Sequence, residues 1–225
     1  MTTGDLVRLD PGNADHVRAA AELHARLLAH SPIPRLGSAF MTRFFYTTLV
    51  EDGLVHCYLY RSGDRYVGFL SLTEKPYSFM SEGRRAHFVR LSALLLLAIL
   101  ARPSRVRILL DVLKAGQRTR PDDAGGAGEF LSFGVLDEFA AARDEKRGLR
   151  IPSVLFDEGI EHFRSRGFRR IEWNVDSSNL RAILFYKSYG ATMERSPLAW
   201  PSDLRVRLQL ESAATPARAR AAGGA

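Results

Sequence analysis

Cysteine is nearly absent from this chain. Cys57 is the only one among 225 residues, which excludes a disulfide framework and a metal site built from cysteines. It lies in an apolar stretch, so a small core residue is the favoured interpretation. His16, His24 and His30 are spaced so that they fall on poorly matched faces of a helix. We therefore expect solvated or capping histidines and no metal site.

A membrane-spanning segment is also missing. The apolar run at residues 92–101, SALLLLAILA, is shorter than the roughly 20 residues that a helix needs to cross a bilayer. The N-terminal stretch, MTTGDLVRLDPGNAD, is too polar for a signal peptide. These two observations predict a cytoplasmic protein.

The apolar run at residues 92–101 has two interpretations. It predicts either a helical insertion that packs on the domain or forms a dimer surface, or an interfacial contact with a membrane. The serine and alanine content and the lack of tryptophan favour packing or dimerisation. The membrane interpretation depends on a basic flank, which consists of Arg84, Arg85, Arg90, Arg102, Arg105 and Arg107.

Acidic residues are outnumbered by basic ones. The chain has 32 Lys and Arg against 25 Asp and Glu, for a net charge of +7. Such an excess suits anionic partners, but the charges are spread along the chain, so solubility is the favoured explanation. We expect no nucleic-acid partner. The hydrophobic fraction of 46% and the length predict one folded domain with a sizeable core.

Hydrophobic periodicity predicts a mixed order of strands and helices. We expect a single domain over residues 1–211 and a disordered tail over 212–225, with a helical insertion at about 82–115 and a flexible loop at 116–128. The other predicted elements are a strand at 5–9, helices at 15–30 and 38–50 separated by a break at 31–37, strands at 54–61, 65–73 and 131–139, and a closing hairpin after residue 190.

The stretch from Arg147 to Gly190 organises the second half of the chain. A basic turn precedes an amphipathic helix at residues 151–166, in which Pro152 suits the first turn. A strand follows at 169–175, and Asp176, Ser177 and Ser178 are candidate N-caps of a further helix. Asn179 and Tyr186 fall on one face of that helix.

Six residues of this region keep a spacing that resembles a known family. The pattern V-x3-N-x2-A-x2-[FL]-Y-x3-G, preceded by a strand, a basic turn, a helix and a strand, is similar to the GNAT superfamily of N-acetyltransferases. The resemblance covers residues 129–190. The matching residues are Val175, Asn179, Ala182, Phe185, Tyr186 and Gly190.

The resemblance implies a fold and a reaction. It implies an α/β (α+β) fold, with a mixed, mostly antiparallel sheet flanked by helices, and transfer of an acetyl group from acetyl-CoA to a primary amine of a small molecule or protein. Tyr186 would be the general acid for the departing thiolate, with a core tyrosine as the alternative. Residues implied to contact CoA are Val135, Leu136, Arg147, Gly148, Leu149, Arg150, Ile151, Ser153 and Asn179.

Several carboxylates are candidates for the general base that would take the proton of the amine. Glu138, at the end of the strand that would line pantetheine, is the preferred candidate. Each candidate base also has a simpler interpretation as a solvated carboxylate. Asn179, implied above to contact CoA, has a simpler interpretation as a helix cap. The other candidates are Glu74, Glu129, Asp137 and Glu172.

One departure from the family pattern concerns the turn that would hold the CoA pyrophosphate. The family turn usually reads [QR]-x-x-G-x-[GA], and its backbone N–H groups bind phosphate at a helix N-terminus. Here Arg150 and Pro152 replace the two small residues, and proline removes one donor. Arg147 and Arg150 would compensate with charged hydrogen bonds. The sequence therefore leaves three functions open: an N-acetyltransferase, a CoA-binding module without turnover, and a membrane-peripheral acyltransferase acting on an envelope precursor. A homodimer is compatible with each of them.

Overall fold

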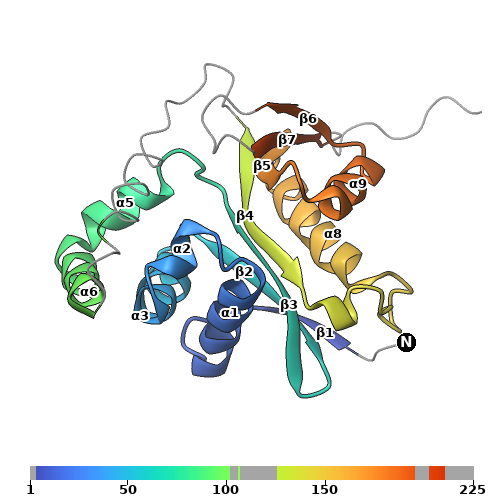
Figure 1. The fold of residues 1–225 in the computed structure, drawn as a ribbon. Coiled ribbons are helices and arrows are strands. Elements are labelled where there is room, and N and C mark those ends of the chain that lie inside the picture. The colour runs from blue at the N-terminus through green and yellow to red at the C-terminus, as the bar shows by residue number, and fades with distance from the viewer. Residues whose placement is uncertain (1–3, 102–105, 107–125, 196–202, 211–225) are drawn as a thin grey trace, which may run out of the picture.

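A seven-stranded sheet forms the centre of the molecule (Figure 1). The computed structural model describes residues 4–101, 106, 126–195 and 203–210. The strand order is β1-β2-β3-β4-β5-β7-β6, and the pairs are antiparallel except for β4 with β5. The predicted mixed, mostly antiparallel sheet is confirmed. The strands are β1 (Gly4–Arg8), β2 (His56–Ser62), β3 (Arg65–Thr73), β4 (Ala127–Val135), β5 (Arg170–Asp176), β6 (Thr192–Arg195) and β7 (Asp203–Gln209).

Helices cover both faces of this sheet. Helix α1 packs on β2, β3 and β4 from one side, and α8 packs on the same strands from the other side, where α9 also lies (Figure 1). The helical segments are α1 (Ala14–Leu27), α2 (Pro32–Arg35), α3 (Ser38–Phe40), η1 (Met41–Thr48), α4 (Leu49–Glu51), α5 (Phe79–Ala86), α6 (Phe88–Ala101), η2 (Asp137–Phe139), α8 (Ile151–Arg164) and α9 (Leu180–Ser188).

The helix predicted at residues 38–50 exists but is wound differently. Its middle, η1, is a π-helix. Two threonine hydroxyls donate to carbonyls five residues earlier, Thr47 to Thr42 at 2.7 Å and Thr48 to Arg43 at 2.9 Å. These bonds accompany the wider turn. Hydrophobic periodicity predicts the apolar face but not the wider winding.

Several predicted boundaries are wrong. The break at residues 31–37 contains the short helix α2, which starts at a proline. The loop at 116–128 ends earlier, because β4 begins at Ala127. The strand predicted at 131–139 ends at Val135 and is followed by the 3-10 turn η2. The part of the expected helical insertion that follows residue 101 lies outside the described residues apart from 106, and most of the loop at 116–128 and the whole tail at 212–225 also lie outside them.

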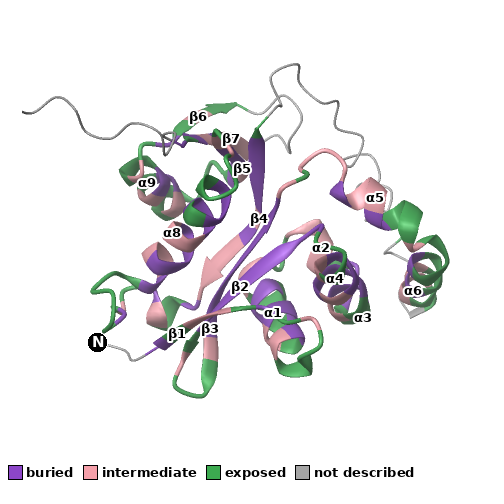
Figure 2. Ribbon diagram, turned by 180° about the vertical axis from the view of Figure 1, so that it is seen from behind, coloured by how far each residue is buried: buried purple, intermediate pink, exposed green. Residues whose placement is uncertain are grey.

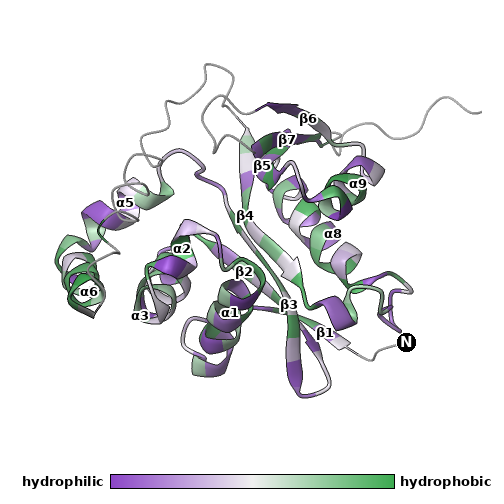
Figure 3. Ribbon diagram, viewed as in Figure 1, coloured by the Kyte–Doolittle hydropathy of each residue, from purple (hydrophilic) through white to green (hydrophobic). Residues whose placement is uncertain are grey.

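The core lies on both faces of the central strands (Figure 2). Cys57 is 1% exposed, which confirms its interpretation as a core residue. Hydrophobic residues of α1 and α8 belong to this core, and Figure 3 colours the ribbon by the hydropathy of each residue. Among the described residues, no helix is long and apolar enough to cross a membrane.

Candidate functional site

Strands β4 and β5 run side by side for three residues and then separate. Their parallel pairing covers Ala127–Glu129 with Arg170–Glu172. At the same level the pairing of β4 with β3 shifts, so that Leu131 is an extra residue between Phe130 and Ser132. A bulge bends its strand and re-aims side chains. The result is an opening between residues 130–135 of β4 and residues 173–176 of β5, which we call the wedge.

Backbone groups of β4 face the wedge. The Leu136 N–H donates to the Val67 carbonyl of β3 at 2.8 Å. Because successive residues of a strand direct their N–H groups to opposite sides, the Val135 N–H points away from β3 and towards the wedge. Val135 is therefore placed to bind an extended ligand, whereas the Leu136 N–H is already bonded to β3.

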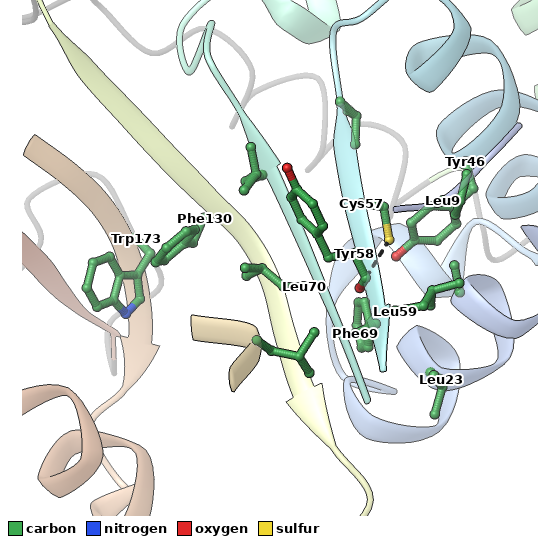
Figure 4. Close-up of a cluster of buried hydrophobic side chains, with 14 of the residues drawn as sticks. Leu9, Leu23, Tyr46, Cys57, Tyr58, Leu59, Phe69, Leu70, Phe130 and Trp173 are labelled. Carbon is green, nitrogen blue, oxygen red and sulfur yellow. Dashed lines mark hydrogen bonds between the residues drawn. The ribbon is translucent and has the colours of Figure 1, made fainter. Parts of the chain in front are cut away.

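Aromatic rings fill the interior side of the wedge. Phe130 of β4 and Trp173 of β5 lie 5.3 Å apart between ring centroids (Figure 4). The Tyr186 ring lies 5.0 Å from Trp173 and 5.6 Å from Phe156, and the residue is 7% exposed. Burial raises the pKa of the Tyr186 hydroxyl, so it stays protonated. This placement fits the alternative interpretation as a core tyrosine, and the general-acid role stays a prediction.

The turn that precedes α8 is pinned by the buried Asp144. We call residues 142–150 the basic turn. The Asp144 carboxylate accepts a hydrogen bond from the Tyr60 hydroxyl at 2.5 Å and another from the Arg147 N–H at 2.7 Å. Gly148 adopts φ +67°, a conformation that glycine adopts without strain. Lys146 binds Asp5 of β1 at 2.7 Å. Sequence reasoning missed Asp144 because its partner Tyr60 belongs to β2, 84 residues away along the chain.

Several backbone amides of the basic turn and of the first residue of α8 are already bonded within the protein. Arg147 donates to the Asp144 side chain, and Gly148 donates to the Asp144 carbonyl at 2.8 Å. Ile151 donates to the Ala142 carbonyl at 3.1 Å, and Pro152 has no N–H. The guanidinium groups of Arg147 and Arg150, by contrast, belong to exposed residues. This turn therefore offers exposed side-chain charge beside a backbone whose amides are partly occupied.

The remaining residues that the resemblance implies for CoA binding have mixed surroundings. Leu149 is 42% exposed, and its carbonyl accepts from the Asp144 N–H. Ser153 lies in the first turn of α8, and its side chain interacts with Tyr189. Asn179 is the N-cap of α9 and accepts from the Ala182 N–H at 3.1 Å. The cap therefore belongs to Asn179 and not to Asp176, Ser177 or Ser178, which confirms the alternative interpretation of Asn179 as a cap.

The preferred base, Glu138, is exposed and paired with arginines. Its carboxylate lies 3.3 Å from Arg65 and 3.7 Å from Arg26. Its own backbone N–H and these two guanidinium groups lower its pKa, which weakens it as a proton acceptor. Asp137 is similarly exposed and lies 3.3 Å from Arg181.

Two other candidate bases lie at the apex of the wedge. Glu129 and Glu172 face each other in the last parallel pair of β4 and β5. Glu172 contacts Arg205 and lies 3.1 Å from Arg170 and 3.2 Å from Arg207, so its charge is neutralised. Glu129 is 8% exposed and belongs, with Glu172, to the last pair before the strands part.

A buried polar network lies on the opposite face of the sheet. His24 of α1 contacts the Tyr46 hydroxyl of η1 at 2.8 Å and the Ser132 hydroxyl of β4 at 3.1 Å. Burial lowers the pKa of His24 to about 3. The expectation that His24 is solvated or caps a helix is wrong. The signal in the sequence is its spacing from Val17 and Ala20, which places it on the apolar face of α1.

A second histidine cluster lies at the C-terminal end of α8, on the side away from the basic turn. His56, Glu74 and His162 bring their ligand atoms within 4.8 Å of one another, so this group could hold a metal. The Glu74 carboxylate lies 3.0 Å from His162 and 2.8 Å from Arg166. Arg8 also contacts His56, and these two guanidinium groups oppose a bound cation. We call the group, with Tyr58, the histidine hub.

Comparison with known proteins gives a consistent result. Residues 122–191 match the model of the acetyltransferase (GNAT) family, and that segment contains the wedge, the basic turn and α9. Residues 122–191 are therefore similar to that family. Its fold matches solved GNAT structures over most of the chain, and no curated protein matches its sequence.

Three structural neighbours illustrate this similarity. A putative acetyltransferase from Acinetobacter baylyi is 12% identical with a TM-score of 0.57, and the match covers 96% of this chain and 97% of the other. The GNAT domain of S. lividans PAT is 16% identical with a TM-score of 0.54, over 92% and 90%. A PaiA N-acetyltransferase from Thermoplasma acidophilum in complex with coenzyme A is 10% identical with a TM-score of 0.50, over 92% and 99%. At these identities the similarity concerns the GNAT fold.

Proposed function

We propose that this GNAT-family protein transfers an acetyl group from acetyl-CoA to a primary amine of a small molecule or protein. The observation that carries the proposal is the separation of β4 and β5 directly beside the basic turn. The wedge supplies an extended backbone edge at Val135, and the turn supplies exposed guanidinium groups. A neighbour of the same fold that binds coenzyme A supports the choice of ligand.

Phosphate binding would depend on arginine. Because the amides of Arg147, Gly148 and Ile151 bond within the protein, the diphosphate would be held mainly by the side chains of Arg147 and Arg150. Charge-assisted hydrogen bonds from guanidinium to phosphate are strong and directional. The proline at the start of α8 is then compatible with binding.

The reaction needs a base for the amine proton, a hydrogen-bond donor to the oxyanion and a proton source for the departing thiolate. In our proposal Glu129 accepts the amine proton, directly or through water, because it lies where the strands part. The amine nitrogen forms a bond to the thioester carbon, the Val135 N–H stabilises the oxyanion, and the carbon–sulfur bond breaks. The thiolate takes a proton from Tyr186, which burial keeps protonated.

A second candidate function is CoA or acyl-group binding without turnover. The bonded amides of Arg147, Gly148 and Ile151 and the burial of Tyr186 favour it. Isothermal titration with acetyl-CoA tests both candidates, and lack of binding at millimolar concentration would exclude both. Release of free thiol in the presence of a panel of amines then separates the enzyme from the binding module.

Variants assign the roles within the wedge. Tyr186→Phe should reduce kcat by about a hundredfold, the lower range for general acid catalysis, with little change in CoA affinity. Equal loss of both would argue against the acid role. Glu129→Gln should reduce kcat by a similar factor, whereas the matched exposed variant Glu138→Gln should change it less than twofold. The reverse result would restore Glu138 as the base.

A further inference from the structure

One face of helix α6 is apolar and exposed. Its five large side chains remain 58–80% accessible, and Ser92 and Ala93 between them are also exposed. At 100° per residue all seven positions lie on one half of the helix. Soluble proteins rarely expose a contiguous apolar patch of this kind unless it is a binding surface. The large residues are Phe88, Val89, Leu96, Leu97 and Leu100.

The opposite face of α6 is attached to the protein. Leu91 and Leu94 are 6% and 7% exposed, and α6 packs against α3 and α5. A Cβ at Gly83 of α5 would lie 2.3 Å from Leu49, so α5 also sits close to the helical layer. His87, between the two helices, contacts Asp52 at 2.7 Å. The apolar face is therefore held in place by the fold (Figures 1 and 3).

The charged residues of the segment that carries this face are all basic from Gly83 onwards. No Asp or Glu occurs between Gly83 and Ala101, whereas Arg84, Arg85 and Arg90 are exposed. By helical geometry Arg90 lies at the edge of the apolar face, at nearly the same angle as Leu97 but two turns before it. A protein partner would have to supply the carboxylates, whereas an anionic bilayer supplies both acyl chains and negative headgroups. A second copy of this chain would bring further arginines and no carboxylate from this helix.

We propose that the exposed face of α6 docks on the surface of an anionic phospholipid bilayer. A helix of 14 residues is about 21 Å long at a rise of 1.5 Å per residue. That is shorter than the hydrocarbon core, so α6 would lie in the plane of the interface. The five large apolar side chains enter the acyl boundary, and the three arginines contact lipid phosphates.

Vesicle flotation of the full chain tests the proposal. We expect binding to vesicles of phosphatidylcholine mixed with phosphatidylglycerol, much weaker binding to phosphatidylcholine alone, and weaker binding at high salt. Leu96→Glu with Leu100→Glu should abolish flotation, whereas the matched exposed pair Leu180→Glu with Leu184→Glu on α9 should not. Unchanged flotation of the α6 variant, or no flotation of the wild type, would overturn the proposal.

Charge is tested separately. Changing Arg84, Arg85 and Arg90 to Gln should weaken binding by about fivefold per arginine, since each basic residue at an anionic surface contributes about 1 kcal/mol. The same change at Arg18, Arg43 and Arg195 should have little effect. Equal losses in both sets would indicate non-specific attraction and contradict docking through α6.

Two further measurements do not depend on enzyme activity. The additional indole fluorescence of the Phe88→Trp variant should be quenched by brominated lipid, because position 88 belongs to the inserted face. Sedimentation should show a monomer without lipid. A dimer that Leu96→Glu dissociates, together with no quenching, would show that the face is an interface between two copies and would overturn the membrane proposal.

Discussion

At its N-terminal end helix α8 meets the basic turn, and at its C-terminal end it contributes His162 to the histidine hub. Both regions are rich in polar groups. In the hub, His162 is bonded to both Tyr58 and Glu74, and its side chain is fully buried. In the basic turn, Asp144 is the buried member that fixes the backbone, while Arg147 and Arg150 remain exposed.

This difference separates a structural role from a binding role. Burial of charged and polar groups is favourable only when they are bonded to one another, so the hub joins β2, the end of β3 and α8. The basic turn uses its backbone in the same way but presents its cations to solvent. We expect changes in the hub to reduce stability, and changes in the turn to reduce ligand binding.

The largest effect should follow from His162→Ala. The substitution leaves Tyr58 and Glu74 without this partner and creates a cavity, so we expect a loss of about 3 kcal/mol in the free energy of unfolding. CoA affinity should change less than twofold. Urea unfolding measures the loss, and Arg164→Ala, on an exposed part of the same helix, is the control with little change expected. Unchanged stability in His162→Ala would contradict a structural role for the hub.

An intermediate effect should follow from acidification. Burial, followed by the charges of His56, Arg166 and Arg8, lowers the pKa of His162 to about 3, and burial alone lowers that of His24 to about 3. Between this value and the unfolded pKa of about 6.5, the unfolded state binds more protons. The free energy of unfolding is therefore unaffected by these histidines above about pH 6.5. It falls as the pH drops from about 6.5 towards 3, by up to about 1.4 kcal/mol per pH unit for each histidine.

Thermal unfolding across this pH range checks the prediction. The double variant His24→Gln with His162→Gln should be less stable at neutral pH but should lose less stability on acidification. An equal slope in the variant and the wild type would assign the acid sensitivity to other groups.

The smallest effect should follow from removing charge in the basic turn. Arg147→Gln and Arg150→Gln should each weaken CoA binding by about fivefold, since an exposed charged hydrogen bond contributes about 1 kcal/mol. Stability should stay within about 0.5 kcal/mol of the wild type. Titration with CoA measures the effect, and Arg18→Gln is the control. Loss of stability without loss of affinity would reverse the comparison between the turn and the hub.

Much of this architecture could be predicted from local patterns. Alternation predicts β5, the strands expected at 54–61 and 65–73 correspond to the antiparallel pair β2 and β3, and helical spacing predicts α8 and α9. These features depend on residues close in sequence, where periodicity and turn chemistry act. The similarity of residues 122–191 to the GNAT family depends on the same local spacing.

The details of the site could not be predicted in this way. Tyr186 has the spacing of the family tyrosine, yet its burial depends on Phe156 and Trp173 from other elements. The sequence favours Glu138 as the base because it ends a predicted strand, but Arg26 and Arg65 approach it only in the folded chain. Long-range contacts decide which of several plausible side chains is exposed, paired or buried.

The sequence by itself determined the order of the elements, the apolar faces of the helices and the position of the basic turn, because these follow from hydrophobic periodicity and from the backbone preferences of single residues. Only the tertiary structure decided where the amides of that turn bond, how far β4 and β5 separate, and that one face of α6 stays open. Each of these depends on groups distant along the chain, such as Tyr60 with Asp144, which are 84 residues apart.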